Sequence, residues 1–184
     1  MDAMIERPDA GDPGTLHAET PDLFFKEMVD RVLEDCRLEP SEDSAAYLVH
    51  MLARFVRPGG LLNDVGARPE HPLGRMLLHG VDTVGPERFV LLRCTGDLAL
   101  FLSGFFVDCL ERRRVSEEYY RSIGSMAYGH AAGCCRPRAS ASLFEELADR
   151  FGELTVVLHH VSERCGTTSN ASLRGQIVAS GHLH

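Results

Sequence analysis

The sequence predicts an all-α fold, a single-domain bundle of about six to eight helices. Apolar residues recur at intervals of three and four along most of the chain, which is the spacing of one face of an α-helix. Ser, Thr and Pro stand where helices are expected to begin, and Gly or Pro where they are expected to end. No segment alternates apolar and polar residues as a half-buried β-strand does.

The chain has 184 residues, of which 44% are hydrophobic, and this is enough for one domain with a substantial core. Residues 1–19 are rich in Pro, Gly, Asp and Glu, so we expect a disordered or loosely attached N-terminal arm. The helical domain is expected over residues 20–180, with a frayed tail after it.

The first two helices carry clear start signals. Thr20 followed by Pro21 is typical of an N-cap and a first helical residue, and Pro40 is expected to end this segment. Ser41 is expected to cap a second helix, which residues 57–60 (Arg-Pro-Gly-Gly) stop.

A loop is expected over residues 59–72, because this segment contains three Gly and two Pro residues. A short helix is expected over 72–79. The central helix should start at Pro86 and reach about Arg112. Its apolar residues lie on all sides, which is typical of a buried helix.

The second half of the domain should also be helical. Ser116 is expected to cap a helix over about 117–132, and a turn is expected over 133–138. Apolar spacing predicts another long helix over 143–161, broken near Gly152. Residues 167–170 are expected to cap a last short helix.

The helix predicted over 117–132 is unusually rich in small residues, and each internal glycine costs about 1 kcal/mol relative to alanine. One explanation is a close crossing with the central helix, at or near Gly104. The other is a ligand or partner helix that lies on the small residues, with tyrosines beside it. The candidate binding residues are Tyr119, Tyr120, Tyr128 and His130.

Four motifs carry a family resemblance: Leu-Ser-Gly-Phe-Phe at 102–106, Tyr-Tyr at 119–120, Ser-Met-Ala-Tyr at 125–128 and Leu-Phe-Glu-Glu-Leu-Ala at 143–148. With them the chain resembles a group of uncharacterised, myxobacterial-type bacterial proteins over roughly residues 20–165. The resemblance implies a helical cytosolic protein. It implies no activity and no catalytic residue.

Charge and hydropathy exclude some partners. The formal net charge of −8 argues against nucleic acid and anionic membranes. The longest apolar run, residues 98–107, is too short to span a bilayer. Because the acidic N-terminus lacks the apolar core of a secretory signal, we expect a cytoplasmic protein whose six cysteines are reduced.

No catalytic or metal-binding motif stands out. The nine histidines do not form His-Glu-x-x-His or His-x-x-x-His patterns, and no Cys-x-x-Cys occurs, so we expect neither a metal nor a cofactor. His130 is the best axial-ligand candidate if a tetrapyrrole binds. Cys134 and Cys135 are a candidate reactive pair, because Arg136 and Arg138 could lower a thiol pKa. Glu145 and Glu146 are expected to be ordinary solvated helix positions.

These observations favour a non-catalytic helical interaction or regulatory module that binds a protein partner. The alternative is a helical pocket for a small molecule or a cofactor such as a tetrapyrrole. An enzyme is the least favoured interpretation, and the sequence leaves homo-oligomer formation open.

Overall fold

The computed structural model describes residues 20–57, 73–105, 116–136 and 138–169. Within these residues seven helices pack together and no strand occurs, which confirms the all-α prediction. The helices are α1 (Pro21–Cys36), α2 (Glu42–Val56), α4 (Leu73–Asp82), α5 (Pro86–Phe105), α7 (Glu117–Cys134), α8 (Arg138–Asp149) and α9 (Phe151–Ser169).

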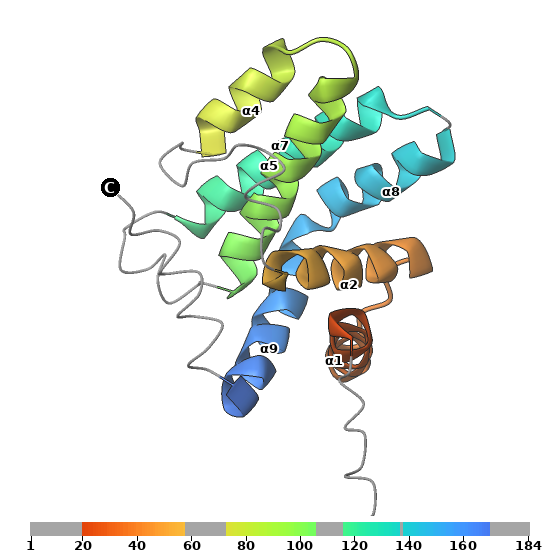
Figure 1. Cartoon of the computed structure of the whole chain (residues 1–184), viewed down its shortest axis with the longest axis vertical. Helices are drawn as coiled ribbons and strands as arrows, with labels where there is room; N and C mark the ends of the chain where they lie inside the picture. Colours follow the sequence, from red (N-terminus) through yellow and green to blue (C-terminus); the bar gives the residue numbers. More distant parts are fainter. Residues whose placement is uncertain (1–19, 58–72, 106–115, 137, 170–184) are drawn as a thin grey trace, which may run out of the picture.

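Helix α5 lies at the centre of the bundle. It packs against α4, α7 and α9, and α7 passes behind it in Figure 1. Helix α8 packs back on α7, whereas α1 and α2 form a pair at the lower right of Figure 1. Nearly every residue of α5 between Leu92 and Gly104 is buried, in agreement with its apolar pattern on all sides.

The three predicted N-caps are confirmed. The hydroxyl groups of Thr20, Ser41 and Ser116 each accept a hydrogen bond from the backbone N–H three residues later, at 3.2–3.4 Å. Helix α1 ends at Cys36, earlier than the Pro40 that we expected to end it. Arg37 adopts the left-handed conformation, with φ of 54°, and this turns the chain out of the helix.

Other helix ends also differ from the prediction, and in α4, α7 and α9 helical hydrogen bonding continues past the expected stops. Helix α4 extends to Asp82 instead of residue 79, and α7 continues to Cys134, where an extended Cys135 ends it. The long C-terminal stretch breaks at Arg150, two residues before Gly152. Helix α9 runs through residues 167–169, where we expected a new cap.

Several predicted features lie outside the described residues. They are the N-terminal arm (1–19), the loop before α4, the end of the central helix beyond Phe105, and the C-terminal tail. The structure therefore tests the helical domain only over its described ranges.

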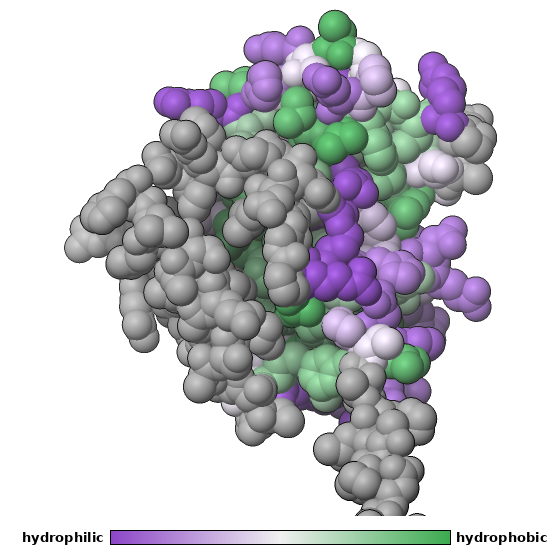
Figure 2. All heavy atoms as spheres, in the orientation of Figure 1, coloured by the Kyte–Doolittle hydropathy of each residue, from purple (hydrophilic) through white to green (hydrophobic). Residues whose placement is uncertain are grey.

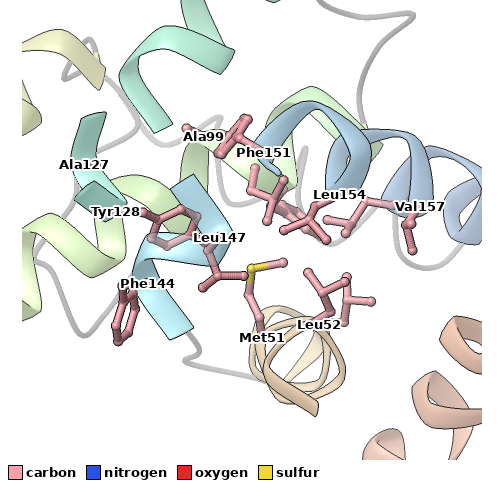
Figure 3. Packing of buried hydrophobic residues seen from close by; sticks show 14 of the residues in the cluster. Met51, Leu52, Ala99, Ala127, Tyr128, Phe144, Leu147, Phe151, Leu154 and Val157 are labelled. Atoms are coloured by element: carbon pink, nitrogen blue, oxygen red, sulfur yellow. The ribbon is translucent and has the colours of Figure 1, made fainter. Parts of the chain in front are cut away.

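Aromatic and aliphatic side chains from five helices meet in the core. Figure 3 shows Tyr128 of α7 beside Phe144 and Leu147 of α8, with Phe151 of α9 next to Ala99 of α5. Met51 and Leu52 of α2 close the opposite side. Burial of these side chains is the main stabilising contribution to the fold.

The contact expected between α7 and Gly104 of the central helix does not occur, because Gly104 lies against Leu158 of α9. Helix α7 meets α5 at other positions: a Cβ added at Gly96 would lie 2.6 Å from the ring of Tyr128, and a Cβ added at Gly124 would lie 3.1 Å from Ala99. Gly96 and Gly104 are both needed because a side chain there would overlap a side chain of the neighbouring helix.

Among the coloured residues of Figure 2, polar side chains gather at the right, and hydrophobic residues reach the surface near the top, where Figure 1 places α4 and the start of α5. Leu78 and Val84 are exposed in this region. No helix in the described ranges has the length and apolar character needed to cross a bilayer.

Candidate interaction surface and its buried support

The four candidate binding residues lie on different sides of α7. Tyr128 is fully buried, Tyr120 is half-buried, and Tyr119 and His130 are exposed. An α-helix turns by about 100° per residue, which places Tyr119 and His130 on one side and Tyr128 on the opposite side. The structure therefore brings Tyr119 and His130 to one side of α7, where the hydroxyl of Tyr119 accepts a hydrogen bond from the backbone N–H of Gly74 in α4 (3.1 Å). The ring of Tyr128 points to the opposite side, into the core.

Tyr128 belongs to a buried polar cluster centred on Asp97 of α5. One carboxylate oxygen, Oδ1, accepts hydrogen bonds from the hydroxyl groups of Tyr47 (2.5 Å) and Tyr128 (2.9 Å). The other oxygen, Oδ2, accepts no hydrogen bond within the described part of the chain, and a guanidinium nitrogen of Arg54 lies 3.8 Å from it. A single carboxylate thus links α2, α5 and α7.

The electrostatics of this cluster follow from its burial. Burial raises the pKa of Asp97, although the tyrosine hydrogen bonds and the charges of Arg93 and Arg54 oppose the rise. Burial and the nearby carboxylate raise the pKa values of Tyr47 and Tyr128 well above their usual range. The two tyrosines are therefore neutral hydrogen-bond donors at physiological pH.

Aromatic packing fixes the same side chains. The ring of Tyr128 packs against Tyr47, Phe144 and Phe151, with ring centroids 6.0–6.3 Å apart. Such pairs contribute about 0.5–1.5 kcal/mol each beyond the area that they bury. Because Tyr128 is held by both packing and a hydrogen bond, the orientation of α7 about its own axis is fixed.

This orientation turns another set of α7 residues to the surface. We call it the outer face of α7, and it consists of Glu118, Ser122, Met126, Gly129 and Gly133, all exposed, with Tyr119 and His130 beside it. The side chain of Met126 is 47% exposed. A Cβ added at Gly129 or Gly133 would meet no residue of the described ranges within 4 Å.

The charges on α7 are confined to its ends. Glu117 and Glu118 lie in the first turn, and Arg121 pairs with Glu118 at 2.5 Å. From Ser122 to Cys134 the sequence contains no Asp, Glu, Lys or Arg. Arg136 follows the helix and is exposed. The middle of the outer face is thus uncharged in a chain whose net charge is −8.

One prediction about an individual residue was wrong. Glu146 is not an ordinary solvated residue, because its carboxylate accepts hydrogen bonds from the backbone N–H of Ser41 (2.9 Å) and the hydroxyls of Ser41 and Ser44 at the start of α2. Burial would raise the pKa of Glu146, but these hydrogen bonds and Arg150 hold it below its usual value. Glu146 therefore joins α8 to α2.

The thiol of Cys135 belongs to the candidate reactive pair. Burial and the neighbouring Cys134 raise its pKa, which is opposite to the lowering that would make a thiol reactive. The thiols of Cys134 and Cys135 donate to backbone carbonyls of the preceding helical turn. Among the described residues, no three His, Cys, Asp or Glu side chains are grouped so that they could hold a metal ion.

Sequence reasoning missed the role of Asp97. The available signal was an acidic residue inside a buried, otherwise apolar helix, four residues after Arg93 on the same helical face. A buried carboxylate needs hydrogen-bond donors, and neutral tyrosines are suitable ones. The sequence could not show which tyrosines these were, because Tyr47 and Tyr128 are distant from Asp97 along the chain.

In comparisons with known proteins, no family model, no curated protein and no solved structure matches this chain.

Proposed function

We propose that this protein is a non-catalytic helical interaction module and that the outer face of α7 binds its partner. The observation that supports the proposal is the pair of open glycines, Gly129 and Gly133, inside an exposed helix. Each weakens the helix by about 1 kcal/mol relative to alanine, and no residue of the described chain packs against either of them. A partner helix or loop that approaches the backbone closely would require them.

The chemistry of the buried cluster favours the same interpretation. Asp97 is the most strongly buried ionisable carboxylate described, and two tyrosines occupy its Oδ1 atom. It lies in the core and not on a surface that a substrate could reach. Its role is to hold α7 in place, which makes it a positioning residue for the outer face.

Substitution of the two glycines tests the proposal. Gly129→Gln with Gly133→Gln adds side chains that block close approach, and it should also strengthen the helix because glutamine is a good helix former. We expect the tagged variant to melt at a higher temperature than the wild type and to lose the partners that wild type captures from cell lysate. Lost binding with a better fold cannot be explained by misfolding.

The matched control is Val156→Gln, a substitution at an exposed position of α9. It should capture the same partners as wild type. If the glycine variant retains those partners, or if Val156→Gln loses them equally, the outer face of α7 is not the binding surface.

We also infer a cytoplasmic location. Its support is that Cys36, Cys94, Cys134, Cys135 and Cys165 all carry free thiols. Thiol titration of denatured protein from freshly lysed cells, without reductant, should find all six cysteines of the chain free. A reproducible loss of two or four thiols would contradict this location.

A further inference from the structure

We propose that the hairpin formed by α1 and α2 is a pH-sensitive gate, which pivots at its own turn and is held closed by Asp97 of α5. This inference is independent of the outer face of α7, because the gate contacts α5, α7 and α8 through side chains of α2. The two ends of α2 are held by different kinds of contact, and this difference separates a hinge from a latch.

The hinge is the turn between α1 and α2, which polar contacts hold to the rest of the bundle. Arg164 of α9 pairs with Asp35 near the end of α1. Glu146 of α8 accepts hydrogen bonds from the backbone N–H and the hydroxyl of Ser41, at 2.9 and 2.5 Å. Arg150, between α8 and α9, donates to a backbone carbonyl of the turn at 2.7 Å. These contacts fix the turn, so a movement of the hairpin would pivot there.

The latch lies farther along α2, where long side chains and not close backbone packing join it to α5. The hydroxyl of Tyr47 donates a hydrogen bond to Asp97, and a guanidinium nitrogen of Arg54 lies 3.8 Å from the same carboxylate. The ring of Phe55 stacks on Phe101, with centroids 3.9 Å apart. Asp97 thus makes the polar link between the moving end of α2 and the central helix.

The closed form is sensitive to the charge of Asp97 because this carboxylate is fully buried. Two tyrosine hydroxyls share Oδ1, whereas Oδ2 accepts no hydrogen bond within the described ranges. A proton on Oδ2 removes the costly buried charge and leaves both hydrogen bonds to Oδ1 in place. The side chain of Arg54, beside Oδ2, is 26% exposed, so water is near the cluster on the α2 side. Hydration of the ionised carboxylate therefore favours movement of α2.

The charged and titratable groups that act on Asp97 come from three helices. They are Tyr47 and Arg54 of α2, Arg93 and Cys94 of α5, and Tyr128 of α7. The neighbouring side chains from α8 and α9, Phe144 and Phe151, are uncharged. Burial raises the pKa of Asp97 from 3.8, against the opposing effect of the tyrosine hydrogen bonds and the arginine charges. Opening hydrates the carboxyl group and returns its pKa towards the usual value.

Rising pH therefore opens the gate more often. The proton on Asp97 contributes to closure fully below pH 3.8, and this contribution is lost as the pH rises through the raised pKa. Glu146, at the hinge, titrates at lower pH because its pKa lies below its usual value. Burial of Leu48, Met51 and Leu52 keeps the closed form the more populated one. Opening uncovers the aromatic side chains of α7 and α8 on which α2 packs.

Hydrogen exchange of the full chain, measured by mass spectrometry between about pH 4 and about pH 8, tests this inference. Exchange rates are corrected for the intrinsic pH dependence of amide exchange and converted to opening equilibrium constants. Peptides of α1 and α2 should have larger opening constants than peptides of α7 and α8, which open only when the whole domain unfolds. If all four helices have equal constants at every pH, the hairpin does not open by itself and the inference is wrong.

Asp97→Asn tests the latch, because asparagine cannot titrate. The ratio of the wild-type opening constant to that of the variant, for peptides of α1 and α2, should rise with pH by up to about tenfold per pH unit and then level off. The matched control is Glu145→Gln, at an exposed position of α8, for which the same ratio should not change with pH. A ratio for Asp97→Asn that is constant or falls with pH overturns the inference.

Tyr47→Phe provides a second test, which decides the matter if Asp97→Asn does not fold. It keeps the aromatic ring and removes the hydroxyl that bonds to Asp97. Because this hydrogen bond lowers the pKa of Asp97, its loss should move the pH-dependent rise in the opening of α1 and α2 to higher pH. A rise with an unchanged midpoint would show that Asp97 is not the group that controls the gate.

Discussion

The two sides of α7 use glycine for opposite reasons. On the inner side, a Cβ at Gly124 would overlap the ring of Phe151, and Ala99 of α5 lies 3.1 Å away. On the outer side, a Cβ at Gly129 or Gly133 would meet no described residue within 4 Å. The inner glycine stabilises the protein because it permits close packing, whereas the outer glycines destabilise the helix without any packing in return.

The difference teaches that composition alone does not assign a role to a small residue. All three glycines lie within ten positions of one helix. Tyr128 and Met126 make the same contrast for large residues, since one is fully buried and the other is about half exposed. Substitutions on the two sides of α7 should therefore give opposite results.

The largest expected effect is at Tyr128. Tyr128→Ala removes a fully buried ring and one donor to Asp97, so we expect a loss of about 3–5 kcal/mol in the free energy of unfolding. The matched outer substitution, Met126→Ala, should change that free energy by less than about 1 kcal/mol. Denaturant titration of both variants checks this, and equal losses would show that the two sides do not differ.

The next effect is at the inner glycine. Gly124→Leu should lose about 1–3 kcal/mol or more, because the new side chain overlaps Phe151. Gly104→Leu should lose a similar amount against Leu158. Thermal melts decide the matter, since an unchanged melting temperature would mean that these helices can move apart freely.

The free energy of unfolding should depend on pH through the buried carboxyl group of Asp97. Its pKa is raised by burial from 3.8, so the folded protein retains a proton that the unfolded chain releases. This contribution to stability is fully present below pH 3.8 and is lost as the pH rises through the raised pKa. A single proton limits the slope to about 1.4 kcal/mol per pH unit.

The matched variant for this measurement is Asp97→Asn, which cannot titrate. The unfolding free energy of wild type minus that of Asp97→Asn should fall as the pH rises above 3.8, because the other carboxylates are common to both proteins. A difference that is constant or rises with pH would contradict a raised pKa in the folded state.

The smallest effect is a gain. Gly133→Ala should raise the unfolding free energy by about 1 kcal/mol, since alanine favours the helix and meets no neighbour. Differential scanning calorimetry on dilute, monomeric protein checks this. A loss of stability would show that the outer face packs against something within the chain.

Local signals in the sequence predicted the helices well. Thr20, Ser41 and Ser116 cap α1, α2 and α7 as expected, because a cap depends on residues within one helical turn. The end of α1 was less predictable. It depends on the left-handed conformation of Arg37, which few non-glycine residues adopt. No local sequence pattern predicted this conformation.

The candidate site was only partly predictable, for the same physical reason. The sequence pointed to α7 through its glycines and tyrosines, but it could not show that Tyr128 lies inside and Met126 outside. The sequence also did not show that the carboxylate of Glu146 would cap α2, a helix more than a hundred residues earlier. These relations depend on which helices meet in space.

The sequence by itself determined the helical content, the starts of α1, α2, α5 and α7 and the buried character of α5, because apolar spacing and capping act over one or two turns. Only the tertiary structure decided the contact of Gly96 in α5 with Tyr128 in α7, the link from Asp97 to Tyr47 and Tyr128, and the side of α7 that remains exposed. Those features depend on contacts between segments that are far apart in the sequence. Because a protein interior is close-packed, few arrangements of these segments fit together.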